Sequence, residues 1–181
     1  NRNQREEVLL PILSISVAGK KQYAVVRAIW DSGSSDSFIT EKIAEAIGLD
    51  VIERQRPMKL TTFGCTAEKD VFLDVVLGRL RLLNGSWMVV ELKVVPQLGI
   101  EQRKLERSFP ALAKLRGTFA DSYSEDVDVP EQLHMLLGGD VKPRVMRAGL
   151  QMIGPNLCAF NTAFGWVIEG QSGQPTSRSR T

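Results

Sequence analysis

Two apolar segments of this chain each end in a turn that contains glycine and an acid, and this pattern restricts the folds open to the sequence. The first segment lies in "AIWDSGSSDSFIT" (residues 28–40), where an apolar run ends at Trp30 and another begins at Phe38. The second lies in "LHMLLGGD" (residues 133–140). A short apolar run bounded by turn residues is typical of a buried strand. Either turn alone fits an ordinary strand end, but the two together, in this order, indicate a more specific arrangement.

The rest of the chain has the pattern of a mainly β domain with a few short helices. Runs rich in β-branched and aromatic residues alternate with turn residues, which predicts strands joined in hairpins. Strands are expected at residues 8–17 and 22–30 around "AGKK", within 58–78 around a turn at 63–66, on both sides of the hairpin signal Asn84–Gly85, and within 156–170. Short helices are expected at residues 40–48, with Thr40 as N-cap and Gly48 as stop, at 109–117, and at the start of 141–150 with Pro143 in the first turn.

The length of 181 residues suits one domain with short extensions. We expect that domain at residues 8–170, after a disordered N-terminal extension at 1–7. The tail "QSGQPTSRSRT" (residues 171–181) is too polar to form a strand and is expected to be a disordered tail or linker. The chain begins without Met, so we expect it to be a piece of a longer protein.

Composition excludes several classes of function. The 23 basic and 21 acidic residues give a net charge of +2, which offers no reason for a nucleic-acid or membrane partner. No apolar run approaches the roughly 20 residues that a membrane span needs. Two distant cysteines, Cys65 and Cys158, make neither a disulfide framework nor a metal site, and the single His134 argues against zinc and against Ser-His or Cys-His catalysis. We therefore expect no metal, no other cofactor, and an intracellular protein with reduced thiols.

The turn "DSGSS" (residues 31–35) is the best candidate for chemistry. Asp, Ser and Gly are common turn formers, so a lone Asp-Ser-Gly is a weak signal. Here, however, the triplet directly follows a strongly apolar strand, which places the carboxyl group of Asp31 where water is partly excluded, as at many catalytic acids. Gly33 has no side chain and leaves room for another chain to approach. This context shifts the balance from an ordinary turn toward an acid that takes part in proton transfer.

Three segments carry a resemblance to a known family: "IWDSGSSDSFITEKIAEAIGL", "LHMLLGGD" and "NTAFGWVIEG". Together they resemble a retropepsin-type aspartic protease, and more narrowly the protease domain of BEL/Pao-type retrotransposon polyproteins. The last segment distinguishes BEL/Pao elements from retroviral-like proteases in general. The resemblance implies a retropepsin-like acid protease barrel with a few short helices. Residues 79–129 match weakly and are expected to be an insertion relative to minimal retroviral proteases.

The resemblance assigns the catalytic role to Asp31, the acid of the D-[ST]-G motif. The chain contains one such triplet, so the resemblance implies a homodimer with Asp31 of both subunits at a two-fold axis. Two carboxyl groups that face each other closely across such an axis share one proton. One then acts as general base on a water molecule while the other polarises the scissile carbonyl. The implied substrate is an extended polypeptide, the chain's own polyprotein, cut in the cytoplasm or within a virus-like particle.

Five residues around the acid would support the loop or bind substrate in such enzymes. Ser32 would bond across the dimer and Gly33 would let the substrate backbone lie close. Ser34 would donate to the catalytic carboxylate and so favour a more acidic pH optimum. Ser35 and Asp36 lie where such enzymes contact the substrate main chain.

Two further segments would complete the site. The hairpin tip "TTFGCT" (residues 61–66) has the position of a flap that closes over substrate, with Phe63, Gly64 and Cys65 as its contacts. An exposed Cys65 there would make activity sensitive to oxidation.

The glycine strand, Leu137, Gly138, Gly139 and Asp140, would pass behind the catalytic loop and allow close backbone approach. Asp140 is expected to cap the following helix or to pair with an arginine, and not to act as a second catalytic acid.

Two other functions stay open at this point. The same fold could be a catalytically latent module for dimerisation or for binding an extended peptide. It could also be a retropepsin-like protease of a cellular protein. The intact Asp31-Ser32-Gly33 triplet favours an active enzyme over the latent module, and the closing "GWVIEG" favours the retrotransposon over the cellular protein.

Overall fold

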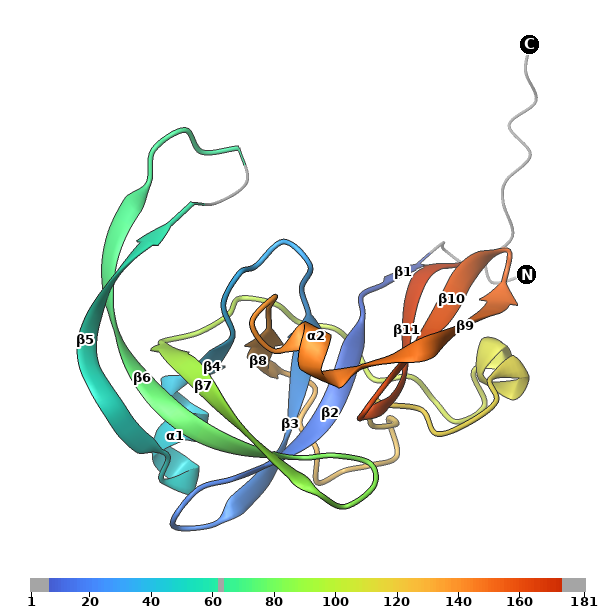
Figure 1. Ribbon diagram of the computed structural model, residues 1–181. Coiled ribbons are helices and arrows are strands. Elements are labelled where there is room, and N and C mark those ends of the chain that lie inside the picture. The colour runs from blue at the N-terminus through green and yellow to red at the C-terminus, as the bar shows by residue number, and fades with distance from the viewer. Residues whose placement is uncertain (1–6, 62–63, 174–181) are drawn as a thin grey trace.

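The computed structural model describes residues 7–61 and 64–173 and contains a closed β-barrel with a second sheet beside it (Figure 1). The barrel sheet has the order β2-β3-β8-β4-β7-β6-β5, and a further pairing of β2 with β6 closes six of these strands into a barrel. Its strands are β2 (Ile12–Ala18), β3 (Tyr23–Trp30), β4 (Phe38–Thr40), β5 (Asp50–Leu60), β6 (Lys69–Arg81), β7 (Trp87–Val95) and β8 (Leu133–Leu137). The mainly β fold class and the barrel that the resemblance implies are confirmed.

The first hairpin forms where the sequence predicts it, because its residues alternate between core and surface. β2 and β3 pair antiparallel from Ile12 opposite Ile29 to Ala18 opposite Tyr23. Leu13, Ile15 and Val17 are fully buried and belong to the main core inside the barrel. Each such side chain contributes about 1.5–3 kcal/mol when it leaves water, so this alternation fixes which face of the hairpin turns inward.

β8, the strand that precedes Gly138, lies between β3 and β4, the strands before and after the Asp31 loop. β8 pairs parallel with β3 and antiparallel with β4. All five of its residues are buried, since strands cover it on both edges and the core covers its faces. The loop at residues 31–37 leaves β3 and returns in β4 around the end of β8, which brings the two motifs together.

Three short helical segments occur close to the predicted places. α1 (Glu41–Ile47) ends at Gly48, whose φ of 71° is left-handed and suits glycine. Thr40 precedes α1 as predicted, but its hydroxyl bonds to the ring of His134 and not to the helix N-terminus. η1 (Pro110–Lys114) is a 3-10 helix, and α2 (Lys142–Val145) has its proline in the first turn.

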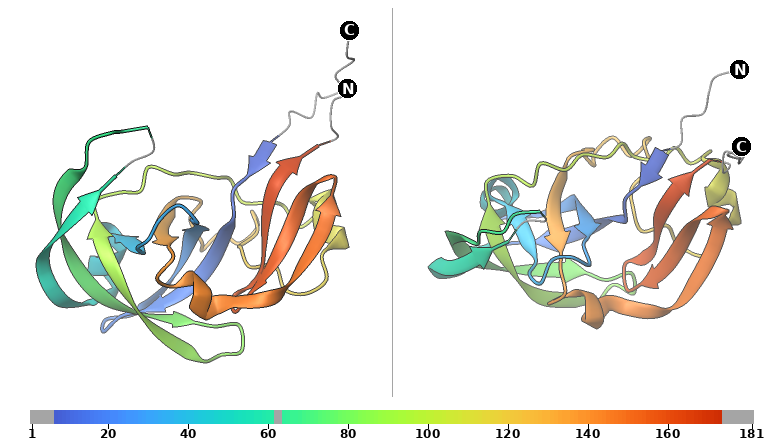
Figure 2. Two further views of the ribbon diagram at one scale, coloured as in Figure 1. Left: turned by 45° about the horizontal axis from the view of Figure 1, so that its top comes forward. Right: turned by 90° about the horizontal axis from the view of Figure 1, so that it is seen from above.

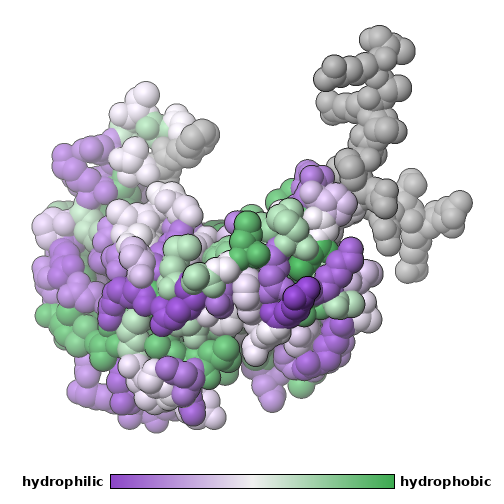
Figure 3. Space-filling view, turned by 45° about the vertical axis from the view of Figure 1, so that its right-hand side comes forward, coloured by the Kyte–Doolittle hydropathy of each residue, from purple (hydrophilic) through white to green (hydrophobic). Residues whose placement is uncertain are grey.

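A four-stranded sheet with the order β1-β11-β10-β9 packs beside the barrel (Figure 2). Its strands are β1 (Glu7–Leu9), β9 (Met146–Gly154), β10 (Asn156–Thr162) and β11 (Gly165–Ser172). Its edge strand β9 carries three exposed apolar side chains, Met146, Leu150 and Met152. The face that comes forward in Figure 3 shows hydrophobic and hydrophilic residues side by side.

This sheet moves the predicted domain limits outward by one or two residues. Glu7 pairs with Ser172 and Val8 with Gln171, although both partners fall in the segment judged too polar for a strand. A strand edge is held by backbone hydrogen bonds, so polar side chains that face water do not prevent it.

The segment of residues 96–132 lies outside both sheets. The insertion expected at residues 79–129, relative to minimal retroviral proteases, stays a prediction. Residues 79–95 belong to β6 and β7, and β6 continues without a break through Arg81. The segment's apolar side chains, among them Leu105 and Phe109, form a second core with β1, β10 and β11. Its η1 lies against the C-terminal sheet in both views of Figure 2.

One buried ion pair joins this segment to the barrel. Arg27 of β3 donates to both carboxylate oxygens of Asp121, at 3.0 and 2.7 Å, and the two side chains are 0% and 4% exposed. The same guanidinium donates to the carbonyl oxygens of Gln102 and Glu131. Four hydrogen bonds therefore tie three points of the segment to one strand of the barrel.

None of the helices within residues 7–61 and 64–173 is long and apolar enough to cross a membrane.

Candidate active site

Asp31 occupies the point where β3 leaves the core. Its backbone N–H donates to the carbonyl oxygen of Leu137 at 3.0 Å, which extends the pairing of β3 with β8 by one residue. Its Oδ1 accepts a hydrogen bond from the backbone N–H of Gly33 at 2.8 Å. The residue is partly exposed, while Ser32 and Gly33 beside it are exposed. The fold therefore fixes one carboxylate oxygen of Asp31 and leaves the group partly accessible at the start of the loop.

The glycine strand holds the Asp31 loop from behind through backbone contacts. Gly139 N–H donates to Ser34 O at 2.8 Å, and Asp140 N–H donates to Ser35 O at 3.1 Å. The buried N–H of Gly138 donates to the hydroxyl of Ser37 at 2.9 Å. These bonds join the two motifs that the sequence singles out.

Gly138 leaves no space for a side chain. A Cβ at this position would lie 2.7 Å from the carbonyl carbon of Asp36 and 2.9 Å from the carbonyl oxygen of Ser34, closer than real Cβ contacts allow. We expect Gly138→Ala to displace the loop and to lower stability by about 1–3 kcal/mol, as overpacking does. Chemical denaturation would measure this, with Gly139→Ala as the matched control because its nearest contact is 3.6 Å. Equal stability of the two variants would contradict the role given to Gly138.

Ser34 does not make the contact that the resemblance implied. Its hydroxyl donates to the carbonyl oxygen of Asp36 at 2.8 Å and not to the carboxylate of Asp31. The turn at residues 34–36 places the carbonyl two residues ahead within reach, as Ser commonly does in turns.

The corrected contact changes the expected effect of Ser34→Ala. We expect this substitution to leave the pH profile of cleavage in place, and a shift of the acid limb would show that the hydroxyl reaches Asp31 in the assembled enzyme.

Lys93 of β7 connects the two acids that flank the loop. Its Nζ lies 2.8 Å from Asp36 Oδ1 and 3.7 Å from Asp140 Oδ2, and its side chain is only 6% exposed. Burial alone would raise the pKa of Asp36, but hydrogen bonds from Lys93 and Ser35 outweigh it and hold that pKa below its usual value. Asp36 therefore stays ionised to a lower pH than a free aspartate.

Asp140 has partners other than those predicted from the sequence. Its Oδ1 accepts from the Ser37 hydroxyl at 2.6 Å, and Lys93 lies on its other oxygen. The N-cap of α2 is Val141, with no side-chain cap bond. The expected helix cap or arginine pair was wrong because the side chain turns toward the loop at residues 34–37, where a hydroxyl and a buried ammonium group are available.

Lys142 is a second buried cation at the loop. Its Nζ donates to Ser32 Oγ at 2.5 Å and lies 5.0 Å from the ring centroid of Trp30. Burial lowers the pKa of Lys142, while the charges of Asp31 and Glu169 act to raise it. A positive charge therefore sits beneath the Asp-Ser-Gly triplet.

The β5–β6 hairpin extends from the barrel with its tip toward the same end as the Asp31 loop (Figures 1 and 2). Gly64 at the tip has a φ of 81° and no atom within 4 Å of a built Cβ, and Cys65 is an exposed free cysteine. Phe63, the third predicted flap contact, lies outside the described residues. Near the base, β5 bulges at Gln55, whose N–H donates to Asp74. The flap role stays a prediction.

His134 has a structural partner, and Cys158 is a half-buried free cysteine. His134 is buried and its Nδ1 lies 2.8 Å from Thr40 Oγ1, and burial lowers the pKa of its ring. Cys158 is half-buried, and burial raises the pKa of its thiol. In the part of the chain that the structure describes, no three His, Cys, Asp or Glu side chains gather as a metal site would require.

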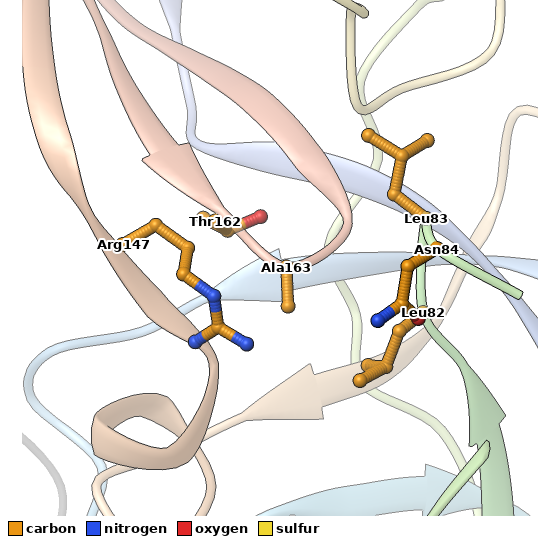
Figure 4. Close-up of a pocket in the computed structure, with 6 residues that line it drawn as sticks. All are labelled: Leu82, Leu83, Asn84, Arg147, Thr162 and Ala163. Atoms are coloured by element: carbon orange, nitrogen blue, oxygen red, sulfur yellow. The ribbon is translucent and has the colours of Figure 1, made fainter. Parts of the chain in front are cut away.

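A pocket of about 310 Å³ lies away from the loop, between the β6–β7 turn and the C-terminal sheet (Figure 4). Leu82, Leu83, Asn84, Arg147, Thr162 and Ala163 line it, and none of the predicted site residues is among them.

Sequence reasoning missed three cations that are among the buried residues, Arg27, Lys93 and Lys142. The first two interrupt apolar strands, "YAVVRAIW" and "VVELKVV", and such an interruption is a signal that a charge is buried and paired. The third follows the second motif directly, and nothing local distinguishes it from a surface lysine.

Solved structures with some similarity include three proteases or protease-like domains. A retropepsin-like aspartic protease from Rickettsia conorii is 12% identical, with a TM-score of 0.38 over 96% of this chain and 100% of that chain. The retroviral protease-like domain of Ddi1 from Leishmania major is 13% identical, with a TM-score of 0.36 over 93% and 99%. EIAV protease complexed with the inhibitor HBY-793 is 12% identical, with a TM-score of 0.28 over 53% and 79%.

A search of curated protein sequences gave no match. A family model described as aspartyl protease matches residues 13–141, a span that includes the loop of Asp31 and the glycine pair behind it. The match covers well over half of the 181 residues. The chain therefore belongs to the aspartyl protease family.

Proposed function

We propose that this chain is an aspartic endopeptidase that works as a homodimer, with Asp31 of each subunit at the two-fold axis. The observation that carries the proposal is the position of Asp31. It ends a buried strand, one of its oxygens is fixed by the N–H of Gly33, and it stands in an exposed loop of an aspartyl protease.

The dimer follows from the environment of the other acids near the loop. An aspartic protease needs two carboxyl groups that share a proton. Asp36 is held by Lys93 and Ser35, and Asp140 is held by Ser37 and Lys93. Both acids are engaged with partners inside the same subunit, and among the described residues neither is a hydrogen-bond partner of Asp31. The second carboxyl group is therefore best supplied by Asp31 of another copy, and a two-fold axis brings a residue to its own counterpart.

The reaction uses the proton that the two carboxyl groups share. The ionised Asp31 takes a proton from a water molecule as its oxygen attacks the carbonyl carbon of the scissile peptide. The protonated Asp31 donates to the carbonyl oxygen, which gives a neutral tetrahedral diol. When the C–N bond breaks, a proton passes to the leaving nitrogen, the products are a carboxylic acid and an amine, and the pair returns to its singly protonated state.

The substrate that we propose is an extended segment of the chain's own retrotransposon polyprotein of BEL/Pao type. Exposed Gly33 and Ser35 lie on the open side of the loop, where an extended backbone could pass. The β5–β6 hairpin would close over that segment and exclude water. We propose that cleavage takes place in the cytoplasm or within a virus-like particle.

The test measures peptide cleavage and the mass of the protein in the same set of buffers. An unstructured polypeptide would be incubated with the protein from pH 4 to 7, and sedimentation would give the mass of the protein under the same conditions. We expect cleavage by a dimer, and inhibition by a pepstatin-like transition-state analogue. A cleaving monomer would contradict the shared pair, and a dimer that cleaves nothing would favour the latent binding module. The surrounding reading frame distinguishes a retrotransposon protease from a protease of a cellular protein. A reverse transcriptase encoded downstream would indicate the retrotransposon, and its absence would indicate a cellular protein.

A further inference from the structure

Lys142 is placed to act on the catalytic loop. It is buried at the start of α2, its ammonium group donates to Ser32 Oγ at 2.5 Å, and it lies over the ring of Trp30. Ser32 and Trp30 are the two neighbours of Asp31 in the chain. One side chain therefore contacts both residues that flank the proposed catalytic acid.

The hydrogen bond has a consequence for the direction of the Ser32 hydroxyl. An ammonium group has three donors and no acceptor, so Ser32 Oγ is the acceptor in this contact. The O–H of Ser32 then has to donate elsewhere, and a bond from a cation polarises the hydroxyl and strengthens that donation. Ser32 is exposed, so a second copy can supply the acceptor.

We infer that Lys142 is a positioning residue that orients Ser32 to donate across the dimer and supplies a positive charge beside the Asp31 pair. The inference rests on the proposed function, since it assumes that two Asp31 loops meet. It adds a residue that neither the motif nor the family match assigns.

A purely structural lysine is a poor explanation of this arrangement. Removing an ammonium group from water is costly, and an apolar side chain of similar length would fill the same space without that cost. The charged groups that act on Lys142 are Asp31 from the loop and Glu169 from β11, and both attract it. The ammonium group itself lies over the Trp30 ring and donates to Ser32, so the charge is directed to the loop, as an electrostatic role requires.

The sign of the effect on cleavage follows from the charge. A cation beside the pair stabilises the negative charge that the pair carries. Without Lys142, both limbs of the pH profile should move to higher pH, by about one unit, which is the low end of the effect of a nearby opposite charge. The dimer should also weaken by about tenfold, the effect of losing about one hydrogen bond, the one that Ser32 donates across the interface.

The experiment compares three variants of the same chain. Lys142→Met removes the charge and keeps the stem, Lys142→Arg keeps the charge, and Lys114→Met is the matched control on the exposed end of η1. We expect Lys142→Met to shift the profile and to raise the dimer dissociation constant, and Lys142→Arg to restore most of both. A Lys142→Met enzyme with the profile and dimer affinity of Lys114→Met would overturn the inference while the proposed function stands.

A second measurement needs no activity and no Lys142 variant. Coupling between two charges is reciprocal, so the loss of the Asp31 charge must act on Lys142. The NMR titration of the Lys142 side chain should move to lower pH in Asp31→Asn relative to the wild-type protein. An unmoved titration overturns the inference, even if Lys142→Met fails to fold. A moved titration, together with a wild-type protein that cleaves nothing, would establish the charge coupling of Lys142 to Asp31 but contradict the proposed function and, with it, the role of Lys142 across the dimer.

Discussion

Asp31→Asn should reduce peptide cleavage by about a thousandfold or more and leave the fold in place. The amide cannot take a proton from water, and loss of a general base or acid commonly costs two to four orders of magnitude. Asn has the shape of Asp, and its oxygen can still accept the N–H of Gly33. Cleavage rates at several pH values would measure the loss. Asp50→Asn is the matched control because Asp50 pairs with the exposed Lys20 on the surface.

Mixing the two proteins tests whether both subunits supply the acid. If mixed dimers are inactive and subunits exchange freely, activity should fall with the square of the wild-type fraction, to about one quarter at equal amounts. A linear fall, to about one half, would mean that each chain carries a complete site. That result would contradict the shared pair even if Asp31→Asn alone is inactive.

The elements that carry the site could be predicted because their signals are local. The hairpin before Asp31 and the strand before Gly138 are apolar runs that end in turn residues, and these runs became β2, β3 and β8. Gly48 ends α1 as predicted because its left-handed conformation suits glycine. In each case the information lies within about ten residues of sequence.

The partners of the charged side chains could not be predicted because they depend on how distant strands meet. Asp140 pairs with Lys93 only because β4 brings β7 close to the end of β8. The alternation of "VVELKVV" predicts a strand but does not say which acid faces its lysine. Ser34 shows the same limit at short range, since its hydroxyl had two acceptors within reach and the turn geometry selected the carbonyl.

The same long-range contacts made the limits of the domain hard to place. Gln171 and Ser172 have no strand signal of their own, and they are ordered by pairing with β1, at the other end of the described chain. Segment 96–132 likewise has weak local patterns, and its position depends on the buried pair between Arg27 and Asp121.

Arg27→Met should lower the free energy of unfolding by about 3–5 kcal/mol, the largest stability effect we expect in this chain. Both side chains of the pair are almost fully buried, and removal of Arg27 leaves the carboxylate of Asp121 without a cation in the core. Two backbone carbonyls of segment 96–132 lose their donor at the same time. Chemical denaturation would measure the change. Arg103→Met is the matched control, since the pair of Arg103 with Glu7 is exposed and should contribute less than about 1 kcal/mol.

The double variant Arg27→Met with Asp121→Leu separates the cost of an unpaired charge from the value of the pair. A buried ion pair can often be replaced by apolar side chains at little cost, because the cost of removing two charges from water is then no longer incurred. We therefore expect the double variant to be more stable than Arg27→Met alone, although the carbonyls of Gln102 and Glu131 still lack their donor. The stability losses of Arg27→Met alone and of Asp121→Leu alone could also add up to the loss of the double variant. The stability of the segment would then depend on the hydrogen bonds of Arg27 to the backbone and not on its charge. In that case Arg27→Lys, which keeps the charge but not the fork of donors, should be nearly as unstable as Arg27→Met.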